Sequence, residues 1–299
     1  MGMIRALQGR FDDYYRKHWA LSSDNWEYFA AKVFPFVVKE CFSRFNHPFF
    51  GPFLRRLFRF TGKNHHAEAC IVPIYKDLSF KANRENSFLP IQKIRESIEE
   101  SSFRVIMKRC ICRDSFKCKK FPRDFACIML GEACHTMVDN GIARPATVRE
   151  CLDHLDRASG YGLVGICAWT EMESIAKGIP AENKLKYFEI CFCCPCCCNG
   201  LVSFKKWHEV PELRKLFKST GWRPRVTEKC TACKACEKVC PMEAIAVLKD
   251  NSVTIDNSCI GCGLCSIHCR AGAIVMEEFE PMKDHILDYF RDIRPQING

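Results

Sequence analysis

Eight cysteines between residues 230 and 269 form two runs with the same spacing, and this repeat constrains the fold more than any other feature. In each run, three cysteines are separated by two residues each, and a fourth follows after three more. The runs are Cys230, Cys233, Cys236 and Cys240, and then Cys259, Cys262, Cys265 and Cys269. Three thiolates on one tight loop can reach neighbouring corners of one iron–sulfur cubane, whereas the fourth points away from it.

This spacing predicts two [4Fe–4S] clusters that exchange their fourth ligands. We expect one cluster to be held by Cys230, Cys233, Cys236 and Cys269. The other is expected to be held by Cys259, Cys262, Cys265 and Cys240. Zinc is the main alternative, since paired C-x2-C units also build zinc ribbons. A ribbon needs four cysteines, however, and would leave the other four unexplained.

Short apolar segments accompany the two runs. Residues 244–247 and 252–255 can pair as strands across a turn at 249–251, and 273–275 repeats the first strand after the second run. With these strands, the stretch resembles the bacterial-type two-cluster ferredoxins, and the resemblance implies a ferredoxin-like module that transfers electrons. The sequence departs from the ferredoxin pattern at Arg270, where the second run usually has proline.

The remaining cysteines bear on the cellular compartment, because the chain of 299 residues has 23 in all. A secreted disulfide framework would be the ordinary explanation of such a number. The first nineteen residues, however, are charged and aromatic without the apolar run of a secretion signal. Directly adjacent cysteines, such as Cys193 and Cys194, are also poorly suited to pairing with each other. We therefore expect a reduced, cytoplasmic protein of an anaerobe.

The formal net charge of the chain is +10. Bound [4Fe–4S] clusters with four thiolates would each add about −2 and make the loaded protein less basic. The sequence has no helix-turn-helix, zinc-finger or RNA-binding signature, so we expect no nucleic-acid partner. It also has no run of eighteen apolar residues, so no membrane span is expected.

Residues 1–67 are predicted to be a helical, basic and aromatic region. Between 1 and 66, eleven Lys and Arg face five Asp and Glu, a net charge of 11 − 5 = +6. Residues 48–60 are predicted to form a basic amphipathic helix with Phe50, Phe53, Leu54, Leu57 and Phe58 on one face. Such faces usually pack within their own protein. Alternatively, this face could bind an acidic redox partner or the inner face of the membrane.

A second cysteine group, Cys110, Cys112, Cys118 and Cys127, follows a predicted strand at 103–107. Between 101 and 125, eight Lys and Arg face two acidic residues. Positive charge lowers thiol pKa values and offsets the negative charge of a thiolate-bound cluster. We therefore predict a metal site here, with Arg113 as a residue that binds the cofactor.

The third group has six cysteines in eight residues, which are Cys191, Cys193, Cys194, Cys196, Cys197 and Cys198. In extended chain, neighbouring side chains point to opposite faces, and Pro195 favours a turn. The segment could therefore present metal ligands on two sides. The second and third groups together have ten thiols, enough for two cubanes with two thiols left over, or for one larger or non-cubane cluster.

Residues 100–276, which carry these two groups ahead of the ferredoxin-like stretch, resemble a family of cysteine-rich, ferredoxin-tailed proteins of anaerobes. That resemblance implies an organisation and a habitat but no reaction. The predicted fold class is α+β, with a helical region at 1–67, a cysteine-rich domain at 68–227, a two-cluster ferredoxin domain at 228–276 and a tail at 277–299. Within the cysteine-rich domain, we predict helices at 125–140 and at 201–218, and a third that opens at 145–147 with Thr147 as its cap and ends by Gly160 or Gly162. We also predict a buried strand at 162–167 and His154 at the surface.

Two functions agree with these features. In the first, the protein passes electrons between two ferredoxin-type clusters and one or two further clusters in the cysteine-rich domain. In the second, it is a reductase that acts on a small substrate, such as a disulfide, at an open or non-cubane cluster. No nucleotide site is predicted, because the glycines at 160, 162 and 165 precede a strand instead of following one. The sequence indicates no catalytic residue.

Overall fold

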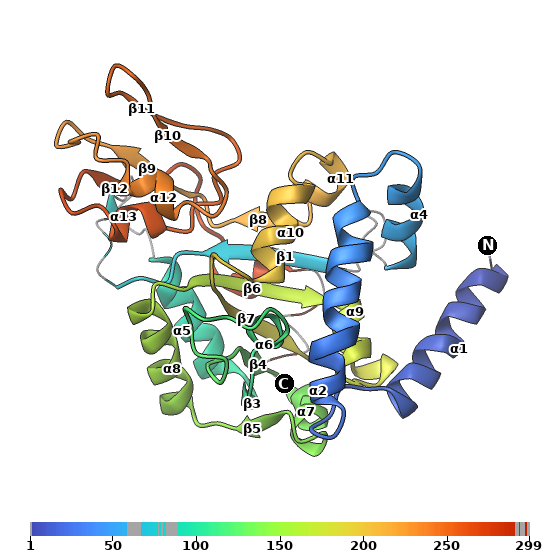
Figure 1. Cartoon of the computed structure of the whole chain (residues 1–299). Coiled ribbons are helices and arrows are strands. Elements are labelled where there is room, and N and C mark those ends of the chain that lie inside the picture. The colour runs from blue at the N-terminus through green and yellow to red at the C-terminus, as the bar shows by residue number, and fades with distance from the viewer. Residues whose placement is uncertain are drawn as a thin grey trace.

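The computed structural model describes residues 2–58, 67–76, 78, 80–81, 89–290, 293 and 297, with only the backbone of residues 2–8. Helices and sheets are mixed along the chain, so the predicted α+β class is confirmed (Figure 1). A large body occupies most of the chain, and a smaller module with its own strands follows it. The predicted division at residues 67, 227 and 276 stays a prediction.

A seven-stranded sheet forms the centre of the body, in the order β5-β3-β4-β7-β6-β1-β8. Neighbouring strands are antiparallel, except that β1 and β8 are parallel. The strands are β1 (Ala67–Val72), β3 (Arg104–Met107), β4 (Ile128–Leu130), β5 (Ala143–Pro145), β6 (Val164–Thr170), β7 (Phe188–Cys193) and β8 (Phe217–Ser219). The strands predicted at 103–107 and 162–167 are therefore present.

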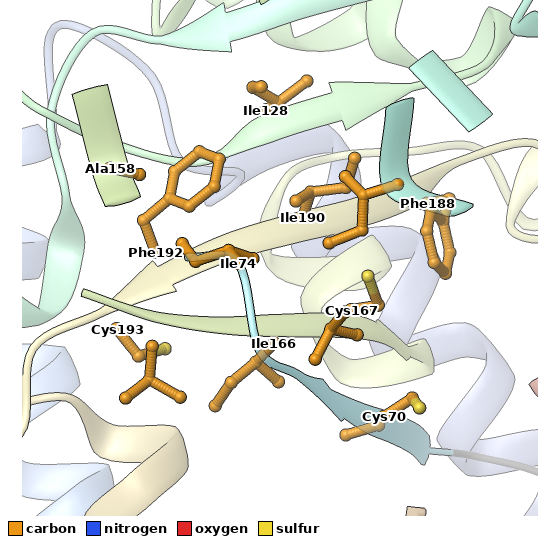
Figure 2. Close-up of a cluster of buried hydrophobic side chains, with 14 of the residues drawn as sticks. Cys70, Ile74, Ile128, Ala158, Ile166, Cys167, Phe188, Ile190, Phe192 and Cys193 are labelled. Carbon is orange, nitrogen blue, oxygen red and sulfur yellow. The ribbon is translucent and has the colours of Figure 1, made fainter. Parts of the chain in front are cut away.

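The two faces of this sheet carry different side chains. Register places Cys70, Cys167 and Ile190 side by side on one face, which we call the helical face. This face packs against α5 (Pro90–Glu100) and α8 (Val148–Gly160). Figure 2 labels Cys70, Cys167 and Ile190 of this face, and also Ile166 and Cys193 of the opposite face. Because side chains alternate along a strand, Cys191 and Cys193 lie on the opposite face. We call this the cysteine face, and α10 (Asn199–Trp207) lies on its side of the sheet (Figure 1).

Helix α8 begins where the sequence predicted it. The Thr147 hydroxyl accepts a hydrogen bond from the Glu150 N–H at 3.2 Å, and the Glu150 carboxylate accepts one from the Thr147 N–H at 2.8 Å. This reciprocal pair satisfies two N–H groups that the first helical turn leaves free. His154 lies on the inner side of α8 and is buried, so its predicted surface position is wrong.

The helix predicted at 125–140 is wrong. Residues Ile128–Leu130 form β4, which pairs with β3 on one side and β7 on the other. Gly131, at φ 101°, then turns the chain, and only Glu132–Cys134 (3₁₀) and α7 (His135–Asp139) are helical. Pairing between two strands in a buried sheet overrides the local helical preference.

The helix predicted at 201–218 is shorter and interrupted. It consists of α10 and α11 (Pro211–Arg214), and Phe217–Ser219 then forms β8 instead of a third helical turn. Three short helices complete the body: α6 (Ile111–Ser115), α9 (Glu171–Ala176) and a 3₁₀ turn at Ala181–Asn183. Of these, α6 carries Arg113 and adjoins the N-terminal region.

The N-terminal region is helical as predicted over its described residues. It contains two separate helices, α1 (Gly2–His18) and α4 (Phe50–Leu57), and a continuous helical run between them. This run consists of α2 (Trp26–Tyr28), a π-helical turn (Phe29–Val33), α3 (Phe34–Phe36), a second π-helical turn (Val37–Cys41) and a 3₁₀ turn (Phe42–Arg44). Buried Trp26 donates its Nε1–H to the Asp114 carboxylate at 2.8 Å, which fixes this run against α6.

The amphipathic face predicted at 48–60 is divided between the interior and the solvent. Leu54 and Phe58 pack beside the buried Phe45, whereas the side chains of Phe50 and Phe53 are 61% and 64% exposed. Packing within the protein therefore accounts for only part of this face. Residues 59 and 60 of the predicted helix lie outside the described residues.

The module contains a hairpin and a three-stranded sheet. The hairpin pairs β10 (Ile245–Val247) with β11 (Val253–Ile255), as predicted. In the sheet, β12 (Ile274–Glu278) lies between β9 (Trp222–Val226) and β2 (Phe80–Lys81). Short helices α12 (Ala235–Val239) and α13 (Leu264–Ile267) carry cysteines of the two runs. Because β2 comes from the body's part of the chain, the sheet joins the module to the body.

After β12 the chain returns to the body. A 3₁₀ turn at Ile286–Tyr289 places Ile286 and Leu287 in the body core, and Phe290 packs edge-on against Phe188 at 4.8 Å between ring centroids. Ile293 and Ile297 are also fully buried, and the other residues after 290 lie outside the described part. The tail therefore packs across the helical face. No helix in the described part of the chain combines the length and hydropathy that a membrane crossing requires.

Candidate iron–sulfur centres

The two cysteine runs of the module repeat in structure as well as in sequence, 29 residues apart (259 − 230). Val226 pairs with Ile274 in one half, and the corresponding residues Ile255 and Ile245 pair in the other. A matching backbone hydrogen bond closes each half, from Thr227 to Ala273 at 2.8 Å and from Asp256 to Ala244 at 2.9 Å. The duplication therefore includes the strands that flank each cysteine run.

Each half also has three residues with positive φ at equivalent positions. The second half has Gly261, Gly263 and Gly272, and the first half has Ala232, Lys234 and Glu243. Glycine adopts this conformation freely, whereas other residues are strained in it by about 1–2 kcal/mol each. Turns of this kind direct successive N–H groups to one side and create anion-binding concavities. The backbone is therefore shaped for a negatively charged group in both halves.

Backbone N–H groups also donate hydrogen bonds to cysteine sulfurs. Ala244 donates to Cys240 at 3.3 Å, and its counterpart Ala273 donates to Cys269 at 3.3 Å. Hydrogen bonds to the sulfurs are among the features that set the reduction potential of an iron–sulfur cluster. The presence of the same hydrogen bond in both halves supports the prediction that both cysteine runs bind the same kind of cluster.

The structure brings together the members of each predicted ligand set. A single pocket is lined by the first set, Cys230, Cys233, Cys236 and Cys269, together with apolar side chains. The second set is close enough for its sulfurs to interact, since burial and then the neighbouring Cys259 and Cys240 raise the pKa of Cys262 to about 12. The crossed arrangement, in which each run contributes its fourth cysteine to the other set, fits this geometry.

The two sets differ in their surroundings. Cys233 of the first set is exposed, whereas Cys262 and Cys265 of the second set are buried. A Cβ atom on Gly263 would lie 3.0 Å from Leu78 and 3.2 Å from Tyr75, both of which belong to the body. The first set therefore reaches solvent at Cys233, and the second set lies against the body.

The other ten cysteines predicted as ligands gather on the cysteine face of the body. Cys191 and Cys193 extend from β7, and Cys127, one residue before β4, has its sulfur 3.0 Å from that of Cys191. Cys110 begins α6 and Cys198 begins α10. Three segments that are distant in sequence therefore meet at one place.

Within this assembly, which we call the cysteine centre, the sulfurs form two groups. The first group, Cys118, Cys194, Cys196 and Cys197, has all four sulfurs within 4.8 Å of one another. The second group consists of Cys110, Cys112, Cys198, Cys193, Cys191 and Cys127, whose thiols shift one another's pKa values. Within it, the sulfurs of Cys127 and Cys191 lie 3.0 Å apart. All ten are free thiols, so the residues are available as metal ligands.

Arg113 is 1% exposed and lies close enough to sulfurs of both groups, Cys194 of the first and Cys110 of the second, to interact with them. Its guanidinium donates hydrogen bonds to the carbonyl oxygens of Phe125, Phe192 and Pro122. Its Nε has no hydrogen-bond partner among the described residues, and the adjacent Asp114 is paired with Arg109 at 2.6 Å instead.

Burial opposes the charge on Arg113, but the sulfurs of Cys110 and Cys194 outweigh this effect and raise its pKa. A buried cation needs an opposite charge nearby. Thiolates, or a thiolate-bound anionic cluster, can supply that charge here, so the residues present fit an iron–sulfur group.

Several thiols of the centre favour the thiolate form that binds metals. Hydrogen bonds from Cys112 and Cys193, followed by the N–H groups of Leu201 and Gly200, hold the pKa of Cys198 well below its usual value. The first turn of α10 supplies these N–H groups, and a helix N-terminus favours negative charge. A hydrogen bond from Cys197 likewise lowers the pKa of Cys194 to about 5.

Sequence reasoning missed one residue of the centre, Glu189. Its carboxylate accepts a hydrogen bond from the Cys191 thiol at 2.5 Å and forms an ion pair with buried Lys177 at 2.7 Å. Its oxygen also lies within 4.8 Å of the Cys127 and Cys191 sulfurs. The alternation of side chains in β7 could have indicated this, because Glu189, Cys191 and Cys193 are two residues apart along a strand.

The five cysteines outside these sets (23 − 8 − 10) lie elsewhere. Cys70 and Cys167 are fully buried on the helical face (Figure 2), Cys134 and Cys151 are buried beside α7 and α8, and Cys41 is half-buried. Burial raises the pKa of the Cys70, Cys134 and Cys167 thiols, so they behave as small apolar side chains.

Comparison with known proteins identifies the module. Residues 229–274 match the family model of the 4Fe–4S dicluster domain. An uncharacterized ferredoxin of Methanocaldococcus jannaschii is 35% identical over 88 residues, which are 29% of this chain and 52% of that protein. Hydrogenase-4 component A of Escherichia coli is 31% identical over 96 residues, which are 32% of this chain and 46% of that protein.

The chain thus spans about half the length of the curated relatives it matches. No solved structure matches it. Residues 229–274 form an iron–sulfur ferredoxin module, and these similarities support an iron–sulfur electron-transfer role.

Proposed function

We propose that this protein is a multi-cluster electron-transfer protein, with two [4Fe–4S] clusters in the module and one or two further iron–sulfur clusters in the cysteine centre of the body. The observation that carries the proposal is the gathering of ten free thiols around buried Arg113, in the same molecule as a ferredoxin module. When bound, such clusters accept and donate single electrons. The residues of the chain hold them, neutralise their charge and exclude water.

In the module, the ligands are the two crossed cysteine sets. In the centre, the group of Cys118, Cys194, Cys196 and Cys197 has the number of thiols that one cubane needs. The group of six thiols and Glu189 would hold the second cluster, with ligands to spare. We favour two separate clusters in the centre over a single bridging one, because four of the ten sulfurs already form a compact set of their own.

The position of the ligand sets suggests a route for electrons. Exposed Cys233 of the first set is the point at which an external partner can approach the module, and the second set lies against the body. Helix α10 begins at the cysteine centre with Cys198 as its cap, and further along it Lys205 forms an ion pair with Glu243 of the module. His208, just after α10, donates a hydrogen bond to the Asn257 carbonyl at 3.3 Å. Helix α10 therefore fixes the module relative to the centre.

The partner is expected to be an acidic redox protein, because residues 1–66 carry a net charge of +6 that cluster binding elsewhere does not offset. We also propose that α4 can hold the protein at an anionic membrane surface, since Phe50 and Phe53 are exposed next to Arg55 and Arg56. Co-sedimentation with liposomes that contain anionic lipid would test this, with Phe50→Ser/Phe53→Ser as the variant. Equal sedimentation of both proteins would contradict it.

Iron and acid-labile sulfide counting on anaerobically purified protein tests the main proposal. The module alone would hold about eight iron atoms, and the centre would raise the total to about twelve to sixteen. Cys194→Ser/Cys197→Ser should lower the count by about four. The matched variant Cys134→Ser/Cys151→Ser, at buried cysteines of the core, should leave it unchanged. Only eight iron atoms in the unmodified protein, or zinc in their place, would overturn the assignment.

The alternative function is an iron–sulfur reductase with a small substrate such as a disulfide. The six-thiol group favours it, because it has two thiols more than a cubane requires and a carboxylate among them. An incompletely ligated cluster or a reactive thiol pair could then remain available to substrate. A substrate-dependent change in the electron spin resonance of the centre, with the module signals unchanged, would distinguish the reductase from a carrier.

A further inference from the structure

We infer that a pocket on the body, next to the cysteine centre, binds a small organic anion that carries a planar ring. The pocket lies between the end of β3, β5, α8 and the loop before Cys127, and its volume is about 500 Å³. Small-molecule sites usually have volumes of about 300–1,000 Å³. Helix α8, with β5 below it, is seen at the lower left of Figure 1. The binding inference stands apart from the proposed function, and only its link to the centre rests on it.

The charged side chains of the pocket favour an anion. Lys108, Arg144 and Arg157 line it, together with a single acidic residue, Asp124. Arg144 is paired with Glu150 at 2.7 Å. In the described part of the chain, no ion pair involves Lys108 or Arg157. Two cations are therefore free to receive a carboxylate or phosphate group.

Aromatic side chains form one wall of the pocket. The Phe125 ring is stacked on the His154 ring, with centroids 4.0 Å apart and planes 11° apart. Tyr161 meets Phe125 edge-on at 5.1 Å, and the Arg157 guanidinium lies 5.3 Å from the Phe125 centroid. These side chains hold one another in place before any ligand arrives. Such a wall suits a flat ring, because aromatic pairs prefer offset-stacked or edge-to-face contacts.

His154 contributes to this wall as a neutral ring. Its Nε2–H donates a hydrogen bond to the Ala126 carbonyl at 2.7 Å. Burial, and then the nearby Arg157, lower its pKa to about 4. At neutral pH the positive charge of the pocket therefore comes from Lys108 and the two arginines, and the ligand selected is an anion with an apolar ring.

A short loop separates this pocket from the cysteine centre. The carbonyls of Pro122 and Phe125 bind Arg113 on the side of the thiols, while the Phe125 side chain and Pro122 line the pocket. Cys127, a predicted ligand, is two residues beyond Phe125. A bound anion would therefore lie one loop away from the thiols and their cluster, which is where a reductase would need its substrate.

Calorimetric titration of the anaerobically purified, full-length protein tests the binding inference, with phenyl phosphate as the probe. Benzyl alcohol and inorganic phosphate separate the contribution of the ring from that of the charge. We expect phenyl phosphate to bind at least tenfold more tightly than either. Arg157→Gln should weaken its binding about tenfold and Arg157→Gln/Lys108→Gln about a hundredfold, because each substitution removes a charged hydrogen-bond donor.

The matched control is Arg149→Gln, which removes an exposed arginine from the same helix but outside the pocket. It should bind phenyl phosphate as the unmodified protein does. Absence of phenyl phosphate binding, equal binding of benzyl alcohol, or an equal loss in Arg149→Gln would overturn the inference. Iron counts on the same samples keep the two proposals distinguishable, since a protein without iron in its centre could still bind the anion.

Discussion

The module and the cysteine centre both gather thiols, but they do so by different means. In the module, three cysteines of each predicted ligand set come from one tight loop, and the fourth follows the other loop after three residues. In the centre, the thiols come from three segments that the body sheet brings together: 110–118, Cys127 and 191–198. The module places its ligands by local backbone geometry, and the centre places them by tertiary packing.

The positive charge that faces the cysteine sulfurs also comes from different groups in the two regions. In the module it comes from N–H groups on loops with positive φ, repeated in both halves. In the centre it comes largely from one buried side chain, Arg113, and from the start of α10. A site that depends on repeated backbone dipoles has no single essential side chain besides its cysteines, whereas the centre depends on Arg113.

The largest expected effect is therefore that of Arg113→Met. The substitution leaves three carbonyl oxygens without their donor and removes the buried charge, so the free energy of unfolding should fall by about 3–5 kcal/mol. Iron should be lost from the centre while the module keeps its own. Urea unfolding and iron counting measure these effects. Arg123→Met, which removes a more distant and exposed partner of Asp114, is the control. An unchanged iron count in Arg113→Met would contradict the conclusion that the centre, unlike the module, depends on one charged side chain.

Within the module, Gly261→Ala should have the next largest effect. A Cβ at this position would overlap the Trp222 carbonyl oxygen, and its φ of 66° already disfavours a side chain. We expect the substitution to destabilise the module by about 2–4 kcal/mol. Thermal unfolding followed by the visible absorption of the module should show this. Stability within experimental error of the unmodified protein would mean that the loop adopts another conformation.

Acidification should distinguish the two regions next. Burial lowers the pKa of His154 in the body to about 4 in the folded protein, from the ordinary histidine value of 6.5. Between these values only the unfolded chain binds the proton. The stability is therefore complete above pH 6.5, and up to about 3 kcal/mol is lost as the pH falls towards 4.

In the module, hydrogen bonds from Ser258 lower the pKa of the exposed Asp256 carboxyl group. The stability that this carboxylate contributes is therefore lost only at pH values below the ordinary range of aspartate pKa values. Urea unfolding at pH 7.5 and 4.5 should show a smaller pH effect in His154→Gln than in the unmodified protein. The same pH dependence in both would refute the role of His154.

The smallest expected effect is a gain of stability from Ala232→Gly. Ala232 occupies the position equivalent to Gly261 and has a φ of 51°. Glycine removes the strain of this conformation but adds freedom to the unfolded chain, so we expect a net gain of about 0.5–1 kcal/mol. Thermal unfolding of the module measures it. A loss of stability would show that the two halves do not share the same strain.

The difference between the module and the centre also explains which features of the structure could be predicted from the sequence. The hairpin of the module follows from alternation, because β10 and β11 are joined by a short turn. The strand after the second run follows from its likeness to the first, since the two halves repeat. Thr147 and Glu150 likewise predict the start of α8, since both partners lie within one helical turn.

The centre was predictable only as a set of candidates. Its division into four and six thiols depends on how β4 and β7 pair, and that pairing also made the predicted helix at 125–140 wrong. The burial of His154 was missed because it depends on Phe125 and Phe192, which come from other segments. A sequence states which residues can bind metal, but the sheet decides which of them meet.

The return of the chain into the body after the module has a consequence for biosynthesis. When residue 278 leaves the ribosome, both halves of the module are available to fold and take up iron. The helical face of the body sheet still lacks Ile286, Leu287 and Phe290, which reach it only with the following dozen residues. The nascent protein therefore passes through a stage at which the strands and cysteines of the module are complete while the apolar core of the body is still open.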